Sequence, residues 1–231
     1  MDVLGQTVVW LADPAHWQGT NGIPLRLAEQ VALSGVALLF AALFALPAGA
    51  WIGHTGRLTR LAVNAANVWR ALPSLAVIAI VLPITAALDP QAGFRLYPTL
   101  VAMVVLALPP MLVNTYTGIA GVERELVEAA RGQGLSERQV FARLELPLAL
   151  GVIVAGIRSG AVQVLATATL GAIFGFGGLG RYLVDGFAQR DGGQLVGGAV
   201  LVAGLVIAVE ALFALVQRAF TPRPLRLAQT G

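Results

Sequence analysis

The side chains that could take part in chemistry are concentrated in one stretch, Val122 to Pro147, of a chain that is otherwise mostly apolar. Arginine and glutamate alternate along it, at Arg124, Arg131, Arg138 and Arg143 and at Glu123, Glu125, Glu128, Glu137 and Glu145. Such a run of balanced charge can be a solvated loop, a DNA-binding helix-turn-helix or a docking element for a partner protein. The segments on either side of it decide among these three interpretations.

The composition excludes most other kinds of site. The chain has 231 residues and no cysteine, which excludes disulfides, thiolate metal sites and thiol catalysis. Its two histidines, His16 and His54, lie far apart in the sequence, so we expect no metal site. Because the chain has no lysine, it contains no phosphate-binding loop of the type G-x-x-x-x-G-K-[ST]. A net charge of +3, dispersed along the chain, gives no reason to expect nucleic-acid binding. We therefore expect a chain without a cofactor, and if ATP drives its activity, the energy must come from another subunit.

A glycine-rich segment offers a second motif. Gly175, Gly177 and Gly180 match the spacing of the dinucleotide-binding fingerprint G-x-G-x-x-G. That fingerprint requires a strand before it and the helix of a βαβ unit after it, whereas here a long apolar segment precedes it. We expect a bent turn or gate instead, because glycine permits close approach of backbones.

The elements that position the charged stretch are two short helices with a break between them. Apolar residues recur at helical spacing in the first half, at Val122, Leu126, Ala129 and Ala130. Gly134 is expected to end this helix in the left-handed conformation. Ser136 and Gln139 form a capping-box pattern that opens the second helix. Pro147 is expected to end that helix and to begin the next one.

The composition of the rest of the chain indicates a membrane protein. Hydrophobic residues make up 57% of the chain and charged residues 12%, with a mean hydropathy of +0.79. Soluble domains carry roughly 25% charged residues, so we predict an all-α membrane protein. Five segments have the roughly 20 apolar residues that a spanning helix requires, namely about 31–53, 61–88, 96–120, 146–174 and 195–217. Residues 1–28 are expected to form an interfacial segment, residues 29–218 the transmembrane domain and residues 219–231 a tail.

Arginine placement predicts the orientation of the spans. Alternate connections carry most of the arginines, namely Arg57, Arg60, Arg124, Arg131, Arg138, Arg143, Arg218, Arg223 and Arg226. The other connections dilute their arginines with aspartates. The positive-inside rule therefore places the N-terminus outside and the stretch 122–147 and the C-terminus in the cytoplasm.

Charges and prolines within the spans are candidates for a translocation pathway. Arg158 and Glu210 lie inside predicted spans, where a charge is costly and must face protein or water. They either line the pathway or pair with each other or with backbone as a structural contact. Prolines are expected to break the spans at Pro73, Pro83, Pro109 and Pro110. The candidate pathway residues are Pro73, Ser74, Arg158 and Glu210.

The position of the charged stretch narrows its interpretation. It lies between two spans and has balanced charge in place of a basic face, which argues against a DNA reader. A solvated loop would not need a capped helix pair, because a short connection would join the spans. A cytoplasmic partner would give its apolar stripe a surface to bury against.

At this point the residues resemble a known family. Glu128, Ala129 and Ala130, followed by Gly134 and then by Leu144, Leu146 and Pro147, are similar in type and spacing to the EAA loop of bacterial ABC-importer permeases. Leu144 departs from the isoleucine that this family prefers. The resemblance implies the type I permease fold in the bacterial cytoplasmic (inner) membrane. It also implies that these seven residues couple the chain to ATP-binding subunits, and that a second permease subunit (in a homodimer or heterodimer) and an extracytoplasmic substrate-binding protein complete the assembly.

Further stretches resemble the permeases for glycine betaine, choline and related osmoprotectants, namely 10–27, 70–76, 146–158 and 174–180. Phe176 stands where alanine is usual in that branch. Two alternatives from other classes stay open, an ion-gradient-driven secondary transporter or channel and a membrane scaffold that recruits a soluble partner. A secondary transporter is expected to carry coupling carboxylates in mid-membrane and often an inverted repeat. Here Glu210 is the only such carboxylate, and no repeat is visible.

Overall fold

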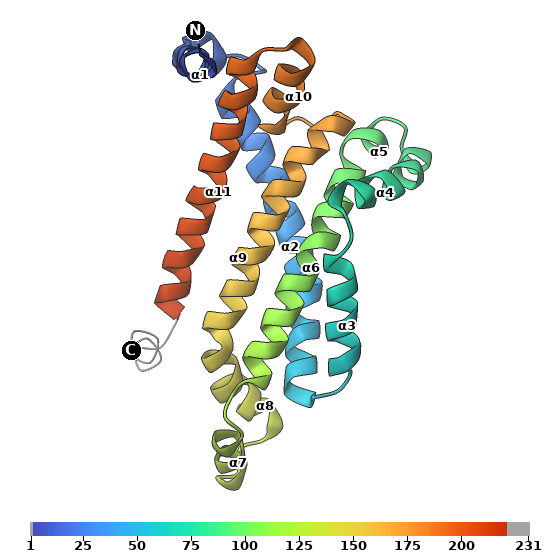
Figure 1. The fold of residues 1–231 in the computed structure, drawn as a ribbon. Helices are drawn as coiled ribbons and strands as arrows, with labels where there is room; N and C mark the ends of the chain where they lie inside the picture. The colour runs from blue at the N-terminus through green and yellow to red at the C-terminus, as the bar shows by residue number, and fades with distance from the viewer. Residues whose placement is uncertain (1, 221–231) are drawn as a thin grey trace. The chain divides into compact units, whose positions relative to one another are not determined.

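This computed structural model describes residues 2–220, and the regular structure in that range is helical. The α-helices are α1 (Val3–Ala12), α2 (Ile23–Thr55), α3 (Thr59–Arg70), α4 (Ser74–Leu88), α5 (Ala92–Arg95), α6 (Tyr97–Ala120), α7 (Arg124–Gly132), α8 (Glu137–Val140), α9 (Leu146–Gly171), α10 (Gly180–Gln189) and α11 (Gly192–Phe220) (Figure 1). Two 3-10 segments, Pro14–Trp17 and Ala172–Phe174, and a π-helix, Phe141–Glu145, join them. The chain divides into two compact units, to both of which α2, α6, α9 and α11 contribute residues.

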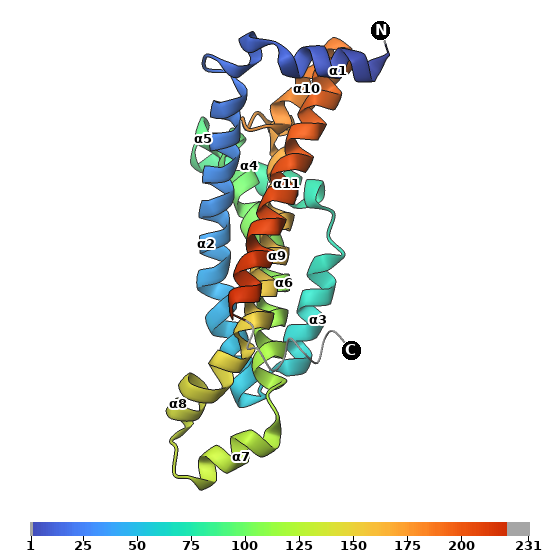
Figure 2. The same cartoon turned by 90° about the vertical axis from the view of Figure 1, so that its left-hand side faces the viewer.

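The first unit contains the described residues up to 39, residues 72–106 and residues 161–209. One of its cores consists of Trp10, Ile23, Leu179 and Tyr182, and a second one is built by α4 and α6. Helix α1 lies across the first turns of α11 (Figure 2). It can approach closely because α11 begins with glycines: a Cβ on Gly197 would lie 2.6 Å from the indole ring of Trp10. The N-terminal segment is thereby fixed to the start of α11.

The second unit contains residues 40–71 and 107–160 and the described residues from 210 onward. Its core cluster is formed by Ile119 of α6 with Ala149 and Ile153 of α9. Glycines bring these helices close together, since a Cβ on Gly49 would lie 2.7 Å from a carbonyl oxygen of α6 and one on Gly156 would lie 2.6 Å from the Cβ of Asn114. Small residues at helix contacts are typical of packing in membranes, where close backbone approach replaces the hydrophobic driving force.

Within the described residues, four helical segments are long and apolar enough to cross a bilayer, or five if one broken pair counts as a single span. The predicted count of five spans agrees with the structure if the broken pair is counted as one span. The broken pair is α3 and α4, so the predicted span 61–88 is interrupted at Ala71–Pro73. The predicted fourth span, 146–174, coincides with the start of α9, and the helical backbone that contains it is already continuous from Glu137. Of the predicted tail 219–231, residues beyond 220, with Arg223 and Arg226, lie outside the described residues.

The prediction that four prolines break helices is correct only for Pro73, which precedes the first residue of α4 in an extended conformation. Pro83 lies inside α4, and Pro109 and Pro110 lie inside α6. A proline removes one backbone hydrogen bond, but neighbouring helices and side chains compensate for this in membrane helices. The helices therefore continue through these three residues.

Candidate functional site

The turn between α7 and α8 is fixed by backbone hydrogen bonds. Gly134 adopts the predicted left-handed conformation, with φ of 85°. The amide of Leu135 donates to the carbonyl of Ala130, at 3.2 Å, and the amide of Gly134 donates to that of Arg131, at 2.9 Å. This pair of bonds is a Schellman motif, which satisfies carbonyls at the end of a helix. The predicted break at this position is therefore a defined turn.

Side chains hold the two helices of this elbow, residues 122–147, in one arrangement. Ser136 and Gln139 form the predicted capping box, in which the Ser136 amide donates to Gln139 Oε1 at 2.9 Å. Arg131 of α7 donates to both carboxylate oxygens of Glu137 of α8, at 2.8 and 2.9 Å. These bonds to Glu137 raise the pKa of Arg131, whose guanidinium is charged throughout the physiological pH range in any case. The bidentate pair ties the limbs of the elbow together across the glycine turn.

The elbow presents a mixed charged and apolar surface. In α7, Val127 is the buried residue, whereas Leu126 is 44% exposed and Ala129 is also exposed. Glu128 keeps 65% of its side chain exposed, and Arg124 is 3.5 Å away. The predicted apolar stripe thus stays largely uncovered by the chain itself, which leaves Leu126, Ala129 and Glu128 free to contact another molecule.

The end of the elbow differs from the prediction. Pro147 lies in the first turn of α9, as predicted, but it does not end the preceding helix, because α8, the π-helix and α9 follow one another without interruption. In the π-helix the amide of Leu146 donates to Phe141, five residues back. Local π geometry of this kind accommodates the amide that proline lacks. Leu144 lies half-buried in the π-helix, and Leu146 packs against the α6–α9 core.

Sequence reasoning missed a contact of the elbow, the one between His54 of α2 and Glu145. His54 is the penultimate residue of α2, and its Nδ1 is 2.5 Å from the carboxylate of Glu145. Glu145 is only 5% exposed. One signal was available, since Glu145 is a charged residue between Leu144 and Leu146. The partner could not be found, because 91 residues separate His54 from Glu145.

The glycine-rich segment of the first unit is a bent turn held by two adjacent side chains of α2. Glu29 accepts a hydrogen bond from the amide of Gly178, at 2.8 Å, and Gln30 accepts one from that of Leu179, at 2.9 Å. Gln30 is fully buried, and its amide group also donates to the carbonyl of Leu165 and the hydroxyl of Thr169 in α9. Gln30 therefore joins α2, α9 and the turn.

Glycine is required in this turn for physical reasons. Gly178 has φ of 70°, and a Cβ there would lie 2.7 Å from the Gln30 side chain. A Cβ on Gly180 would lie 2.4 Å from the carbonyl oxygen of Thr169. The turn is preceded by α9 and followed by α10, and strands are absent from residues 2–220. The spacing that resembles a dinucleotide fingerprint thus reflects close packing.

We expect Gln30→Leu to loosen this turn. The change keeps a similar volume but leaves the buried amide of Leu179 without its hydrogen-bond partner, which costs about 1–3 kcal/mol, and it removes one of the donors to the carbonyl of Leu165. Thermal unfolding of the detergent-solubilised protein should show a midpoint several degrees lower. Gln189→Leu, the same change at an exposed position of α10, is the control and should leave the midpoint unchanged. Equal midpoints for both variants would contradict the bridging role of Gln30.

The two charges within the spans pair with each other. Arg158 of α9 contacts Glu210 of α11 and also donates to Gln217 Oε1, at 3.3 Å. About a third of each charged side chain is exposed, 32% for Arg158 and 39% for Glu210. The mutual pairing that the sequence predicted as one alternative for these two residues is therefore present. Pro73 and Ser74 lie at the start of α4, in the other unit.

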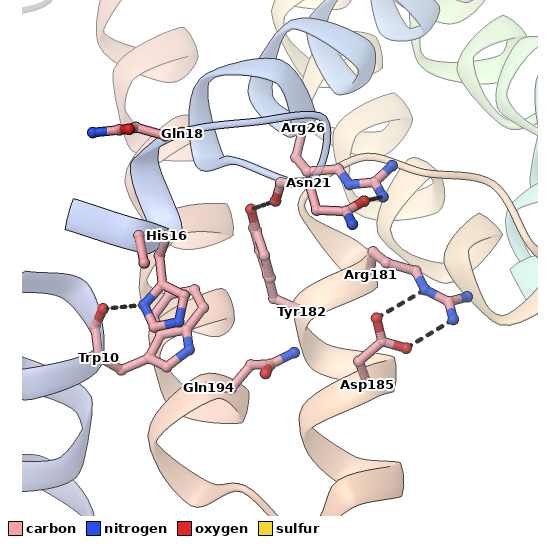
Figure 3. Close-up of a pocket in the computed structure, with 10 residues that line it drawn as sticks. Trp10, His16, Gln18, Asn21, Arg26, Arg181, Tyr182, Asp185 and Gln194 are labelled. Atoms are coloured by element: carbon pink, nitrogen blue, oxygen red, sulfur yellow. Dashed lines mark hydrogen bonds and ion pairs between the residues drawn. The ribbon is translucent and has the colours of Figure 1, made fainter. Parts of the chain in front are cut away.

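A cavity of about 460 Å³ lies in the first unit, between the N-terminal segment and α10 (Figure 3). The rings of Trp10 and His16 stack with centroids 4.4 Å apart, and Tyr182 meets Trp10 edge to face at 5.1 Å. Burial raises the pKa of Tyr182, whose hydroxyl donates to the carbonyl of Asn21 at 2.6 Å. These rings pack on one another and form one wall of the cavity.

Opposite the aromatic wall, the cavity carries fixed charges. Arg181 and Asp185 of α10 pair at 2.8 Å, and Arg26 of α2 binds Asn21 at 2.6 Å (Figure 3). Arg26 also pairs with Glu29 at 2.9 Å. Each charged group is thus held in place by a partner in its own unit. The cavity offers a preorganised polar surface beside α10.

The long apolar helices, their glycine contacts and the capped elbow define a helical membrane permease. A family model described as "Binding-protein-dependent transport system inner membrane component" matches residues 26–226. The chain belongs to this family. It is a multi-pass inner membrane transport subunit and not an enzyme.

Individual relatives cover most of the chain. The choline transport system permease protein OpuBB of Bacillus subtilis is 34% identical over 205 residues, which are 88% of this chain and 91% of the relative. The carnitine transport permease protein OpuCB of Listeria monocytogenes is 33% identical over 201 residues, 87% and 88% of the two chains. The glycine betaine/carnitine/choline transport system permease protein OpuCB of Bacillus subtilis is 32% identical over 209 residues, 90% and 93%.

A solved structure confirms the predicted architecture. An inward-facing structure of the MetNI methionine ABC transporter matches 91% of this chain and 100% of its own chain, with a TM-score of 0.78 and 22% sequence identity. The chain therefore has the fold of a type I ABC-importer permease, as the resemblance implied.

Proposed function

We propose that this chain is the transmembrane subunit of an ATP-driven ABC importer for osmoprotectants such as glycine betaine, choline or related quaternary amines. The observation that supports this substrate class most directly is the similarity to relatives named for choline, carnitine and glycine betaine over about nine-tenths of the chain. Residues 29–218 would form the permease domain, with 1–28 as an external interfacial segment and 219–231 as a cytoplasmic tail.

The elbow is the proposed coupling element. Its residues Glu128, Ala129, Ala130 and Gly134 would face an ATP-binding subunit, and Leu144, Leu146 and Pro147 would connect this contact to α9. Two observations support this coupling role. Leu126 is exposed, and the angle between α7 and α8 is fixed by the backbone bonds of the turn and by the Arg131–Glu137 pair. Burial of an exposed apolar side chain under a partner protein makes the free energy of association more favourable. ATP-driven closure of that partner would then move the elbow as one body.

The other proposed partners follow from the orientation that the arginines predict, with the N-terminus outside and the elbow and C-terminus in the cytoplasm. An extracytoplasmic binding protein would dock on residues 175–194, where the cavity between Tyr182 and the Arg181–Asp185 pair offers a fixed polar surface. A second permease subunit, identical or different, would pack against membrane-exposed surface. Helix α11 is suited to this, because the most apolar window of its described residues buries none of them within the chain.

Four residues are proposed to border the translocation pathway. The contact between two of them, Arg158 and Glu210, also bears on the alternative function, an ion-gradient-driven transporter. Pro73 and Ser74, at the interruption between α3 and α4, would border the pathway, and Arg158 and Glu210 would border it while paired. An ion-gradient-driven transporter would need a carboxylate that exchanges its ion. Glu210 is already bound to Arg158, so no observation favours that alternative.

Reconstitution tests the proposal. The chain, co-purified with its ATPase and supplied with its binding protein, should take up radiolabelled glycine betaine, choline or carnitine into proteoliposomes when ATP is present. Proteoliposomes with a non-hydrolysable ATP analogue, and proteoliposomes without the binding protein, are the controls and should show background uptake. ATP-dependent uptake of other solutes alone would refute the substrate class. Uptake that needs no ATP and stops with a proton or sodium ionophore would refute the importer itself.

A further inference from the structure

The end of α2 touches the elbow through the side chain of His54. Its Nδ1 lies 2.5 Å from Glu145, and its ring meets that of Phe141 edge to face with centroids 5.5 Å apart. Phe141 and Glu145 are the first and last residues of the π-helix. One imidazole of α2 thus contacts both ends of the one irregular turn between the elbow and α9.

A π turn is a rare and costly departure from the α-helix that occurs mostly at functional sites. It persists where surrounding contacts favour it over the regular helix. Here the contacts are the hydrogen-bonded pair with Glu145 and the packing of Phe141 and Leu146 on the α6–α9 core. Glu145 is 95% buried, so without His54 its carboxylate would have to find another partner or turn outward.

His54 also reaches the charged pair of the elbow. Its Nε2 lies 3.6 Å from the carboxylate of Glu137, the group that Arg131 binds from the other side of the glycine turn. One series of contacts therefore connects α2 to α7, from His54 through Glu137 to Arg131. A second contact connects α2 to the segment before α9, from His54 to Glu145. Both limbs of the elbow are connected to the end of α2 by one residue.

We propose that His54 is a positioning residue that fixes the π turn Phe141–Glu145 and thereby sets the orientation of the elbow relative to α2. A displacement of the elbow would then move α2 as well as α9. This inference rests on the proposed coupling function of the elbow. His54 itself needs no contact with solute or ATP.

The test compares three substitutions in the reconstituted importer, with uptake of glycine betaine and ATP hydrolysis measured together. His54→Ala removes both contacts. His54→Asn places an amide N–H where Nδ1 lies and keeps the bond to Glu145, whereas His54→Phe keeps the ring contact and loses the bond. Thr55→Ala is the matched control, since the Thr55 hydroxyl bonds within its own helix end, to the carbonyl of Trp51.

We expect His54→Ala and His54→Phe to lower the amount of solute moved per ATP about tenfold, the scale of one lost hydrogen bond to a charged group. His54→Asn should restore it to within about twofold, a range of less than one neutral hydrogen bond. All variants should still co-purify with the ATPase and migrate as one species in gel filtration, which excludes misfolding. Thr55→Ala should behave as the parent.

Two results would overturn the inference: a normal ratio in His54→Ala, or an Asn variant as defective as the Ala variant. Glu128→Arg, measured in parallel, separates this inference from the function on which it rests. Normal uptake in Glu128→Arg together with a defective His54→Ala would refute docking of an ATPase at Glu128 while the positioning role stands. The reverse result would refute the positioning role alone.

Discussion

Glu128→Arg and Gly134→Val are each expected to abolish ATP-driven uptake while the protein remains inserted and folded. Glu128 is exposed, and its contact within the chain is a surface pair with Arg124 at 3.5 Å, a kind of pair that adds little to stability. Reversing its charge at a partner's surface places like charges together, so we expect uptake to fall by about a hundredfold or more. Gel filtration and membrane yield should match those of the parent.

Gly134→Val acts through backbone geometry and not through charge. No atom lies within 4 Å of the position that a Cβ would take, so a larger side chain meets no steric clash. The φ of 85° is the obstacle, because a β-branched residue strongly disfavours the left-handed region. Valine should therefore unfold the Schellman turn and release α7 from its fixed angle to α8.

Each of these variants has a matched control. Gly134→Asn should keep much of the uptake, because asparagine tolerates the left-handed conformation. The double variant Arg124→Glu, Glu128→Arg restores an opposite-charge pair on α7 but presents the reversed charges to a partner. If docking depends on Glu128, the double variant should transport as poorly as the single one. Full rescue by the double variant would mean that only the pair within α7 matters, and would refute the docking role.

Glu210→Arg is expected to prevent accumulation of folded protein. The variant places two guanidinium groups together in a membrane-spanning region, where an unpaired charge is poorly tolerated. Two like charges that face each other within the spans lose the pairing that offsets the cost of each, so yield of the monodisperse protein should fall roughly tenfold. The measurement is the gel-filtration peak of the detergent extract, compared with total protein in the membrane.

The exchanged pair Arg158→Glu, Glu210→Arg is the control for this variant, because it keeps one charge of each sign in α9 and α11. It should restore most of the folded protein. Uptake by the exchanged pair then answers a further question. Normal uptake would indicate a structural contact, whereas folded protein without uptake would indicate that the pair borders the pathway. Normal yield of Glu210→Arg alone would show that the contact with Arg158 is dispensable.

The features that sequence reasoning predicted correctly are local or compositional. The left-handed Gly134 and the capping box of Ser136 and Gln139 depend on residues within a few positions of each other, where residue type determines conformation. The helical membrane fold followed from long apolar segments. The possible pairing of Arg158 with Glu210 was among the alternatives because a bilayer leaves a charge few other partners.

The features that it missed depend on the tertiary fold. Glu29 and Gln30 reach the glycine turn from a position 149 residues earlier, and nothing in their immediate sequence indicates that contact. His54 and Glu145 are in the same situation. Pro147 lies in the first turn of a helix, as predicted, but the preceding helix does not end there, because a π turn absorbs the missing amide. Sequence patterns therefore located the elbow, and the structure identified what holds it.

The Arg158–Glu210 contact also has a consequence for how the protein is made. The two residues are 52 positions apart, so Arg158 leaves the ribosome well before its partner exists. At a synthesis rate of 5–20 residues per second this interval is roughly 3–10 s. During that time α9 carries a guanidinium group without its carboxylate. Release of α9 into lipid is therefore expected to be favourable only once α11 has emerged, so that the last two spans leave the insertion machinery as a pair.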